Sequence, residues 1–123
     1  MNPRLLVLIG LAALFVTAGI FHFVRPAVFE RVVPPFLPYP RALVYISGAA
    51  EIAGGVALLV PQLRAFAGLW LTALLIAVFP ANIHMALAPE RAGFGIAPLW
   101  LWLRLPAQLV LIAFVWWAAL RER

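Results

Sequence analysis

Four long apolar runs, separated by short segments rich in proline or arginine, divide the chain. They cover residues 5–24, 42–60, 65–88 and 96–120. A helix of 19 residues, the length of the second run, is about 28 Å long, close to the ~30 Å hydrocarbon core of a bilayer. The pattern therefore predicts an all-α fold, a four-helix transmembrane bundle formed by a single domain over residues 1–123.

The first run has to be distinguished from a signal peptide, because it follows a single basic residue, Arg4. The apolar core of a signal peptide has about 7–15 residues and ends at a small-residue cleavage site. This run continues without an ionisable side chain as far as His22, and no clear cleavage site precedes a polar segment. We expect it to be a retained transmembrane helix.

The segment between the first two runs, residues 25–41, reads RPAVFERVVPPFLPYPR and holds five of the eleven prolines. Proline removes an amide donor and biases the residue before it away from helix, so regular helix cannot continue beyond Pro34. The segment is nevertheless apolar. It predicts a short helical turn in the membrane interface, followed by a proline-rich stretch over the end of the bundle. Its role is either a stiff connector or a lid over a site.

Composition supports membrane insertion and excludes several functions. Hydrophobic residues make up 67% of the chain and charged residues 11%, whereas soluble domains carry about 25% charged residues. The net charge of +5 comes from arginines dispersed between apolar runs, which predicts headgroup contacts and no nucleic-acid partner. Each side of the bundle would hold four arginines, so the positive-inside rule does not set the orientation. The absence of cysteine excludes thiol–disulfide chemistry within this chain.

Polar side chains are concentrated in one half of the predicted membrane span, the half nearer the proline-rich segment. Glu51 is the tenth residue of the second run, and an ionisable side chain at mid-membrane costs roughly 2.5–3.5 kcal/mol. Distances from the helix ends place His22, Asn82, His84 and Arg104 in the same half. Intramembrane ionisable residues usually face the bundle interior and have a partner, so this half holds the candidate site.

Glu51 and Arg104 are the two opposite charges inside the predicted spans, and their similar depth predicts that they pair, directly or through water. Ser47 shares a helical face with Glu51, and Gln108 shares one with Arg104. Two interpretations of this group stay open. It is either a polar clasp that fixes which helices pack together, or a site for a ligand or a proton.

The third run contains Pro80, Asn82 and His84 close together. Asn82 continues a stripe of inward positions, so we expect it to face the core, and Pro80 should free the Ile76 carbonyl for another partner. His22 and His84 lie at similar depth on helices that run in the same direction. They could hold a haem, or a metal together with Glu51, although two interfacial histidines that reach toward water are the simpler explanation.

Several stretches together resemble the DoxX family of small four-helix membrane proteins. They are His22-Phe23 with Pro26, the proline-rich segment, Ser47-Gly48 with Glu51 and Gly54-Gly55, and Pro80-Ala81-Asn82-Ile83. The resemblance covers about residues 18–87. It implies a bundle in the bacterial cytoplasmic (inner) membrane, in a family named after a subunit of a thiosulfate:quinone oxidoreductase.

The residues and the resemblance together suggest a non-catalytic accessory subunit of a redox or stress-related membrane system. The cofactor expected is a quinone-like or other small hydrophobic molecule, and the partners expected are the lipid bilayer, a membrane or peripheral oxidoreductase, or further copies of the chain. Two alternatives from other classes are an autonomous transporter that uses Glu51, and a haem or metal electron carrier that uses His22 and His84.

Overall fold

The computed structural model describes residues 2–31, 33–87 and 98–121, with the side chains of 98, 100 and 101 left aside. Within these ranges the regular structure is helical. The long helices are α1 (Pro3–Val24), α3 (Pro40–Leu58), α4 (Arg64–Leu87) and α5 (Pro98–Val115), and α5 continues as the π-helical turn η3 (Trp116–Leu120). Two short elements connect them, α2 (Pro26–Glu30) and the 3-10 turn η1 (Pro61–Leu63).

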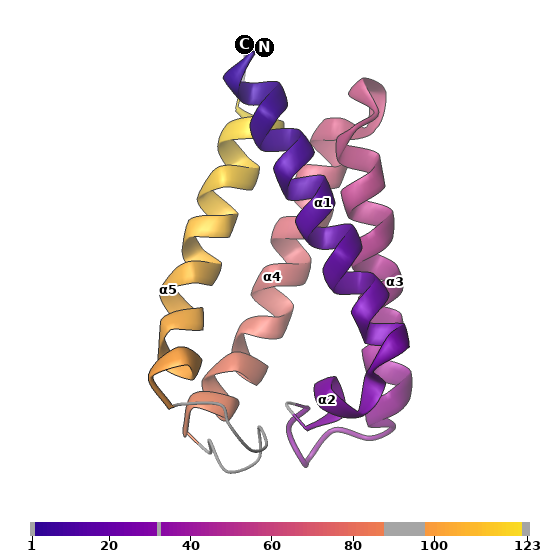
Figure 1. Ribbon diagram of the computed structural model, residues 1–123, viewed down its shortest axis with the longest axis vertical. Helices are drawn as coiled ribbons and strands as arrows, with labels where there is room; N and C mark the ends of the chain where they lie inside the picture. The colour runs from indigo at the N-terminus through magenta and orange to yellow at the C-terminus, as the bar shows by residue number, and fades with distance from the viewer. Residues whose placement is uncertain (1, 32, 88–97, 122–123) are drawn as a thin grey trace.

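The four long helices lie side by side, and both termini are at the same end of the molecule (Figure 1). α1 contacts α3, α3 contacts α4, and α4 contacts α5, while α1 also reaches η3. All four are long and apolar enough to cross a membrane, which indicates a membrane protein. Each of them overlaps one of the predicted apolar runs.

Local sequence explains where the first helices begin. α1 is capped by Asn2, whose side chain accepts a hydrogen bond of 2.8 Å from the backbone N–H of Arg4. Proline occupies the first position of α1, α2 and α3, where its missing N–H costs nothing. Tyr39, just before α3, adopts a left-handed conformation with φ of 53°, which turns the chain into that helix.

The main apolar core lies at the end of the molecule that carries the termini, where all four long helices meet. Its buried members are Leu8, Leu11, Phe15, Leu58, Ala67, Leu71, Leu75, Val115, Ala118 and Ala119. At the same end Arg4 Nε donates a 2.6 Å hydrogen bond to the carbonyl of Ala118, which links α1 to η3. This end is therefore held by both packing and hydrogen bonding.

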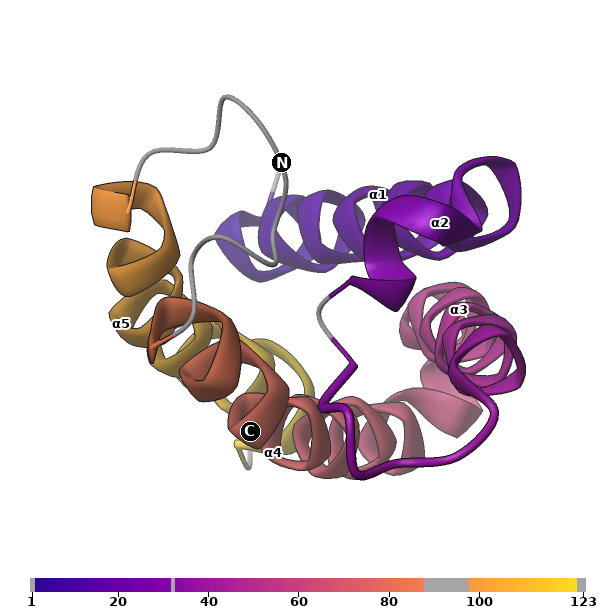
Figure 2. The same ribbon diagram turned by 90° about the horizontal axis from the view of Figure 1, so that it is seen from below.

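Toward the other end the helices divide into two pairs, α1 with α3 and α4 with α5 (Figures 1 and 2). A second, smaller core cluster, Met85 and Ala86 with Leu105 packed on it, lies between α4 and α5 alone. Each pair therefore has its own contacts in the half of the molecule that holds the polar side chains.

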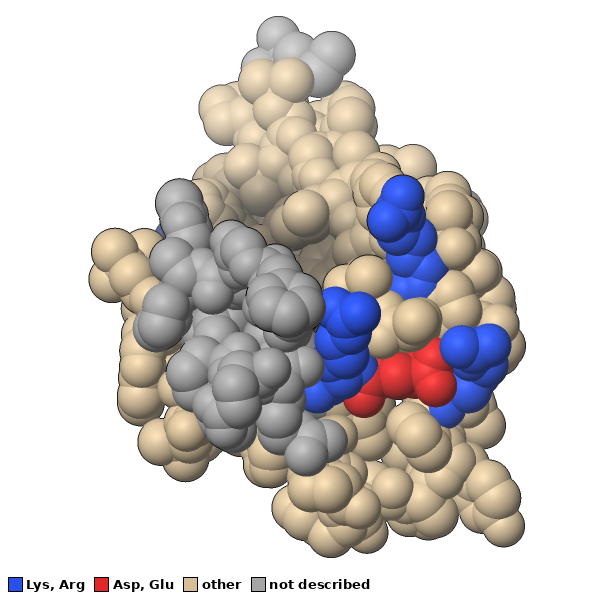
Figure 3. Space-filling view, turned by 60° about the horizontal axis from the view of Figure 1, so that its bottom comes forward, with Lys and Arg blue, Asp and Glu red and all other residues tan. Residues whose placement is uncertain are grey.

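The predicted short helical turn after the first span is present as α2, which lies under α1 and α3 (Figure 2). Glu30, its last residue, pairs with Arg41 at the start of α3, with Nη2 and Oε2 2.7 Å apart. Figure 3 shows acidic and basic side chains meeting on this end of the molecule. The predicted loop over residues 89–95, the predicted start of the last helix at residue 96, and residues 122–123 lie outside the described ranges.

Candidate ligand-binding site

The His22 imidazole of α1 and the Glu51 carboxylate of α3 meet inside the α1–α3 pair. Nε2 of His22 lies 3.2 Å from Oε2 of Glu51, and the two side chains are 11% and 16% exposed. This distance is that of an ion pair. The geometry is not that of an aligned hydrogen bond, and Oε2 accepts no hydrogen bond from any residue that the structure describes. The site thus contains a buried carboxylate oxygen with unused bonding capacity.

The contact of His22 with the backbone sets which ring nitrogen faces Glu51. Nδ1 lies 2.7 Å from the carbonyl oxygen of Ala18, which can only accept, so Nδ1 carries a proton. Nε2 faces the Glu51 carboxyl group. No hydrogen bond links these two groups, so both are available to bond with a third group.

Two glycines allow α1 and α3 to approach closely enough for this contact. A Cβ atom at Gly48 would lie 2.6 Å from Cβ of His22 and 2.9 Å from the carbonyl oxygen of Gly19. A Cβ atom at Gly19 would lie 2.6 Å from the carbonyl oxygen of Gly48. Neither helix can carry a larger residue here without moving away, which is the close packing that small residues permit in membrane proteins.

An aromatic ring from α2 lies against the histidine. The rings of Phe29 and His22 stack with centroids 3.9 Å apart and planes inclined by 21°. α2 therefore holds the imidazole in place, and its apolar ring replaces solvent on one face of the site.

The predicted direct pairing of Glu51 with Arg104 is wrong. The partner of Glu51 is His22, and the Arg104 side chain is exposed on α5. The prediction compared only depths along the helix axes. It could not know that α3 packs mainly on α1 and α4, whereas α5 packs on α4.

A second polar contact lies inside the α4–α5 pair. Asn82 Nδ2 donates to Gln108 Oε1, and Gln108 Nε2 donates to the carbonyl of Leu75. Gln108 is only 4% exposed. Asn82 thus has an interhelical hydrogen bond, as an inward-facing residue should. Gln108 bonds the Leu75 carbonyl, next to the Ile76 carbonyl that Pro80 leaves without its helical donor, and the partner of Ile76 stays a prediction. Each helix pair has one such polar contact.

The remaining candidate residues are Ser47 and His84. Ser47 is half-buried on α3, next to Gly48, and His84 is half-buried near the end of α4. In the described part of the chain, no three His, Cys, Asp or Glu side chains come close enough to hold a metal ion. The predicted set of His22, His84 and Glu51 is therefore not assembled there, and both ring nitrogens of His22 already face other groups.

Gly19 and Phe29 were not singled out from the sequence. A signal for Gly19 was present: Gly19 and His22 are three residues apart, as are Gly48 and Glu51, so each helix carries a glycine and an ionisable residue on one face. Phe29 had no comparable signal, because its contact depends on how α2 folds back under α1.

The fold and the site define a small, all-helical protein with four apolar helices and a buried histidine–glutamate pair. The chain belongs to the family described as a domain of unknown function (DUF8561), which it matches over residues 11–119. Comparison with curated proteins and with solved structures finds no match. The predicted membership of the DoxX family is therefore wrong, because the family model that matches most of the chain is DUF8561.

Proposed function

We propose that this protein is a four-span membrane protein that binds a small hydrophobic molecule at the His22–Glu51 pair, without catalytic activity of its own. The observation that carries the proposal is the Glu51 Oε2 atom, buried inside an apolar helix pair and without a hydrogen bond from the described residues. A polar atom in such surroundings is costly unless it is paired, and a ligand can supply the missing partner.

The chemistry of the pair defines the ligand's head group. An imidazole nitrogen and a carboxyl oxygen can each donate or accept according to whether they carry a proton, so the pair can donate to a carbonyl oxygen or accept from a hydroxyl group. A quinone-like molecule offers both, as carbonyls when oxidised and as hydroxyls when reduced. Its apolar remainder suits a site inside apolar helices, at the end of the molecule where the two helix pairs separate (Figure 1).

Part of the earlier expectation loses its support with the change of family. The DoxX resemblance implied the bacterial cytoplasmic membrane and supported the redox or stress-related system and the oxidoreductase partner, and the match to DUF8561 supports none of the three. The transporter alternative uses the same Glu51 residue and stays a prediction, as does a homo-oligomeric state.

Decylubiquinone is a suitable probe for the proposed binding. The test compares thermal unfolding in detergent of the wild type, Glu51→Gln and a matched control, Glu30→Gln, which makes the same change in the exposed pair with Arg41. At about 100 times the dissociation constant a ligand adds about 2.7 kcal/mol of stability, so the wild type and the control should unfold at a higher temperature with the probe.

Glu51→Gln should show a much smaller shift, because an amide keeps the shape of the side chain but carries no charge and cannot gain or lose a proton. A hydrogen bond to a charged group contributes about 1.5–3 kcal/mol, so affinity should fall at least tenfold. Equal stabilisation of all three proteins would place the probe elsewhere and contradict the site. No stabilisation of any of them would contradict a quinone-like head group.

A further inference from the structure

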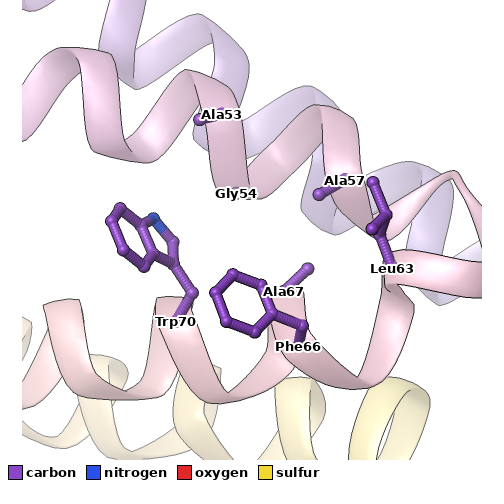
Figure 4. Close-up of a pocket in the computed structure, with 7 residues that line it drawn as sticks. All are labelled: Ala53, Gly54, Ala57, Leu63, Phe66, Ala67 and Trp70. Atoms are coloured by element: carbon purple, nitrogen blue, oxygen red, sulfur yellow. The ribbon is translucent and has the colours of Figure 1, made fainter.

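An apolar groove runs along the outer surface between α3 and α4, at the opposite end of α3 from its contact with α2. It has a volume of about 280 Å³. Its lining residues are Ala53, Gly54 and Ala57 of α3, Leu63 of η1, and Phe66, Ala67 and Trp70 of α4 (Figure 4). All of them are apolar or aromatic, so the groove suits an apolar occupant.

The walls of the groove are held in place by specific contacts. A Cβ atom at Gly54 would lie 2.5 Å from Cδ2 of Leu71, so the two helices touch at the floor of the groove. Trp70 Nε1 donates a 3.0 Å hydrogen bond to the carbonyl of Ala50, which fixes the indole, and the Phe66 ring stacks beside it with centroids 6.2 Å apart. The small residues of α3 face these two rings across the groove (Figure 4).

The shape of the groove fits part of one acyl chain. From Leu63 to Trp70 the groove follows α4 for about 10 Å, from the interhelical turn into the apolar part of the span. Phe66 is 65% exposed on this surface, which in a membrane-spanning helix faces lipid.

A cationic side chain lies at the end of the groove. Arg64 directly follows Leu63, and its Nε donates a 2.8 Å hydrogen bond to the carbonyl of Leu58 at the end of α3. The ion pairs of the described residues are His22 with Glu51 and Arg41 with Glu30, so Arg64 has no acidic partner among them. A guanidinium anchored through Nε still has its Nη donors for a phosphate group.

We propose that this groove binds one phospholipid with an anionic headgroup, with an acyl chain between α3 and α4 and the phosphate on Arg64. This arrangement matches the order of groups in a phospholipid, because Arg64 would meet the charged headgroup at the membrane interface and the groove would meet the acyl chain below it. This lipid site is separate from the His22–Glu51 pair and does not depend on the function proposed for it.

Native mass spectrometry in detergent tests the lipid site with dioleoyl phosphatidylglycerol and dioleoyl phosphatidylcholine, which differ only in the headgroup. The wild type should retain one phosphatidylglycerol at concentrations where phosphatidylcholine is lost. Arg64→Gln should bind both lipids alike, with affinity for phosphatidylglycerol lowered roughly tenfold, whereas Arg64→Lys should keep most of the preference. A preference unchanged in Arg64→Gln would overturn the assignment of Arg64.

Ala53→Leu tests the groove itself, because the added atoms fill the space for the chain. It should lose both lipids, while Ala13→Leu, the same change at an exposed position of α1, should behave as the wild type. Equal lipid retention in these two variants would overturn the groove as the site. A dimer that forms without lipid and is disrupted by Ala53→Leu would also overturn it, because the occupant would then be a second copy of the chain.

Discussion

The contact between α1 and α3 makes a sharp prediction for Gly48. In Gly48→Ala the new Cβ atom would lie 2.6 Å from Cβ of His22 and 2.9 Å from the carbonyl oxygen of Gly19. Neither neighbour is the flexible end of a side chain, so the two helices have to move apart. Overpacking of this kind costs about 1–3 kcal/mol, and we expect the free energy of unfolding to fall by that amount.

Gly10→Ala is the matched control. Gly10 lies on the same helix as Gly19, and a Cβ atom there would have nothing within 4 Å. Alanine is favoured over glycine inside a helix by roughly 0.5–1 kcal/mol, so this variant should be as stable as the wild type or slightly more stable. The two variants make the same chemical change and should therefore act in opposite directions.

Unfolding by sodium dodecyl sulfate in mixed micelles, followed by far-UV circular dichroism, measures the difference. A third variant, Gly19→Ala, tests the mechanism. Its new Cβ atom would lie 2.6 Å from the carbonyl oxygen of Gly48, so this variant should separate the same two helices. The double variant should lose less free energy of unfolding than the two single variants together, because the first methyl group already separates the helices and leaves room for the second. Equal stability of Gly48→Ala and Gly10→Ala, or simple additivity of Gly19→Ala and Gly48→Ala, would refute the close approach.

Three further predictions concern the polar contacts, and thermal or detergent unfolding checks each of them. His22→Leu and Glu51→Leu should each lower the free energy of unfolding, and the double variant should lower it by about 1 kcal/mol less than the sum of the two single losses. Additive losses would mean that the two side chains do not interact. Gln108→Leu should lower the free energy of unfolding by about 1 kcal/mol, because two hydrogen bonds are lost. Gln62→Leu, the same change at an exposed position, should leave it unchanged. Equal effects of the two variants would contradict the interhelical hydrogen bonds. Arg41→Gln should leave the unfolding temperature unchanged, since its pair with Glu30 is exposed, and a clear fall would show that α2 depends on that pair.

Much of the fold could be predicted because the membrane imposes simple rules on sequence. A span requires about 20 apolar residues, so run length alone indicated four spanning helices, and the structure contains four helices of that kind. Pro26 and the prolines from Pro34 onward likewise indicated a short helical turn and its end, and α2 occupies that place. These features depend on neighbouring residues in the chain.

The site was harder to predict because it depends on which helices touch. Depth along the axis placed Glu51 and Arg104 at comparable levels, yet the structure puts them on helices with different neighbours. The deciding residues are Gly19 and Gly48, whose missing Cβ atoms bring α1 against α3 and so bring His22 to Glu51. The sequence of one helix does not show whether a glycine permits close packing, because that depends on which residue of the neighbouring helix lies opposite it.

The amide contact between α4 and α5 shows an intermediate case. The inward position of Asn82 followed from its helical stripe, and Gln108 belonged to a stripe on the last helix. Their hydrogen bond to each other, and that of Gln108 to the Leu75 carbonyl, required the actual rotation of both helices. Helical periodicity therefore gives the face of a residue but not its partner.

The central claim is that the His22–Glu51 pair holds a small hydrophobic molecule, and the most direct measurement is to identify what the purified protein carries. Wild type, Glu51→Gln and Glu30→Gln are isolated from the same membranes in mild detergent, and their solvent extracts are compared by mass spectrometry. The wild type and Glu30→Gln should yield one molecule with a carbonyl or hydroxyl head group in near-stoichiometric amount, and Glu51→Gln should yield much less. Equal amounts of every extracted molecule in the three proteins would contradict a binding site at this pair and make it a structural contact between α1 and α3.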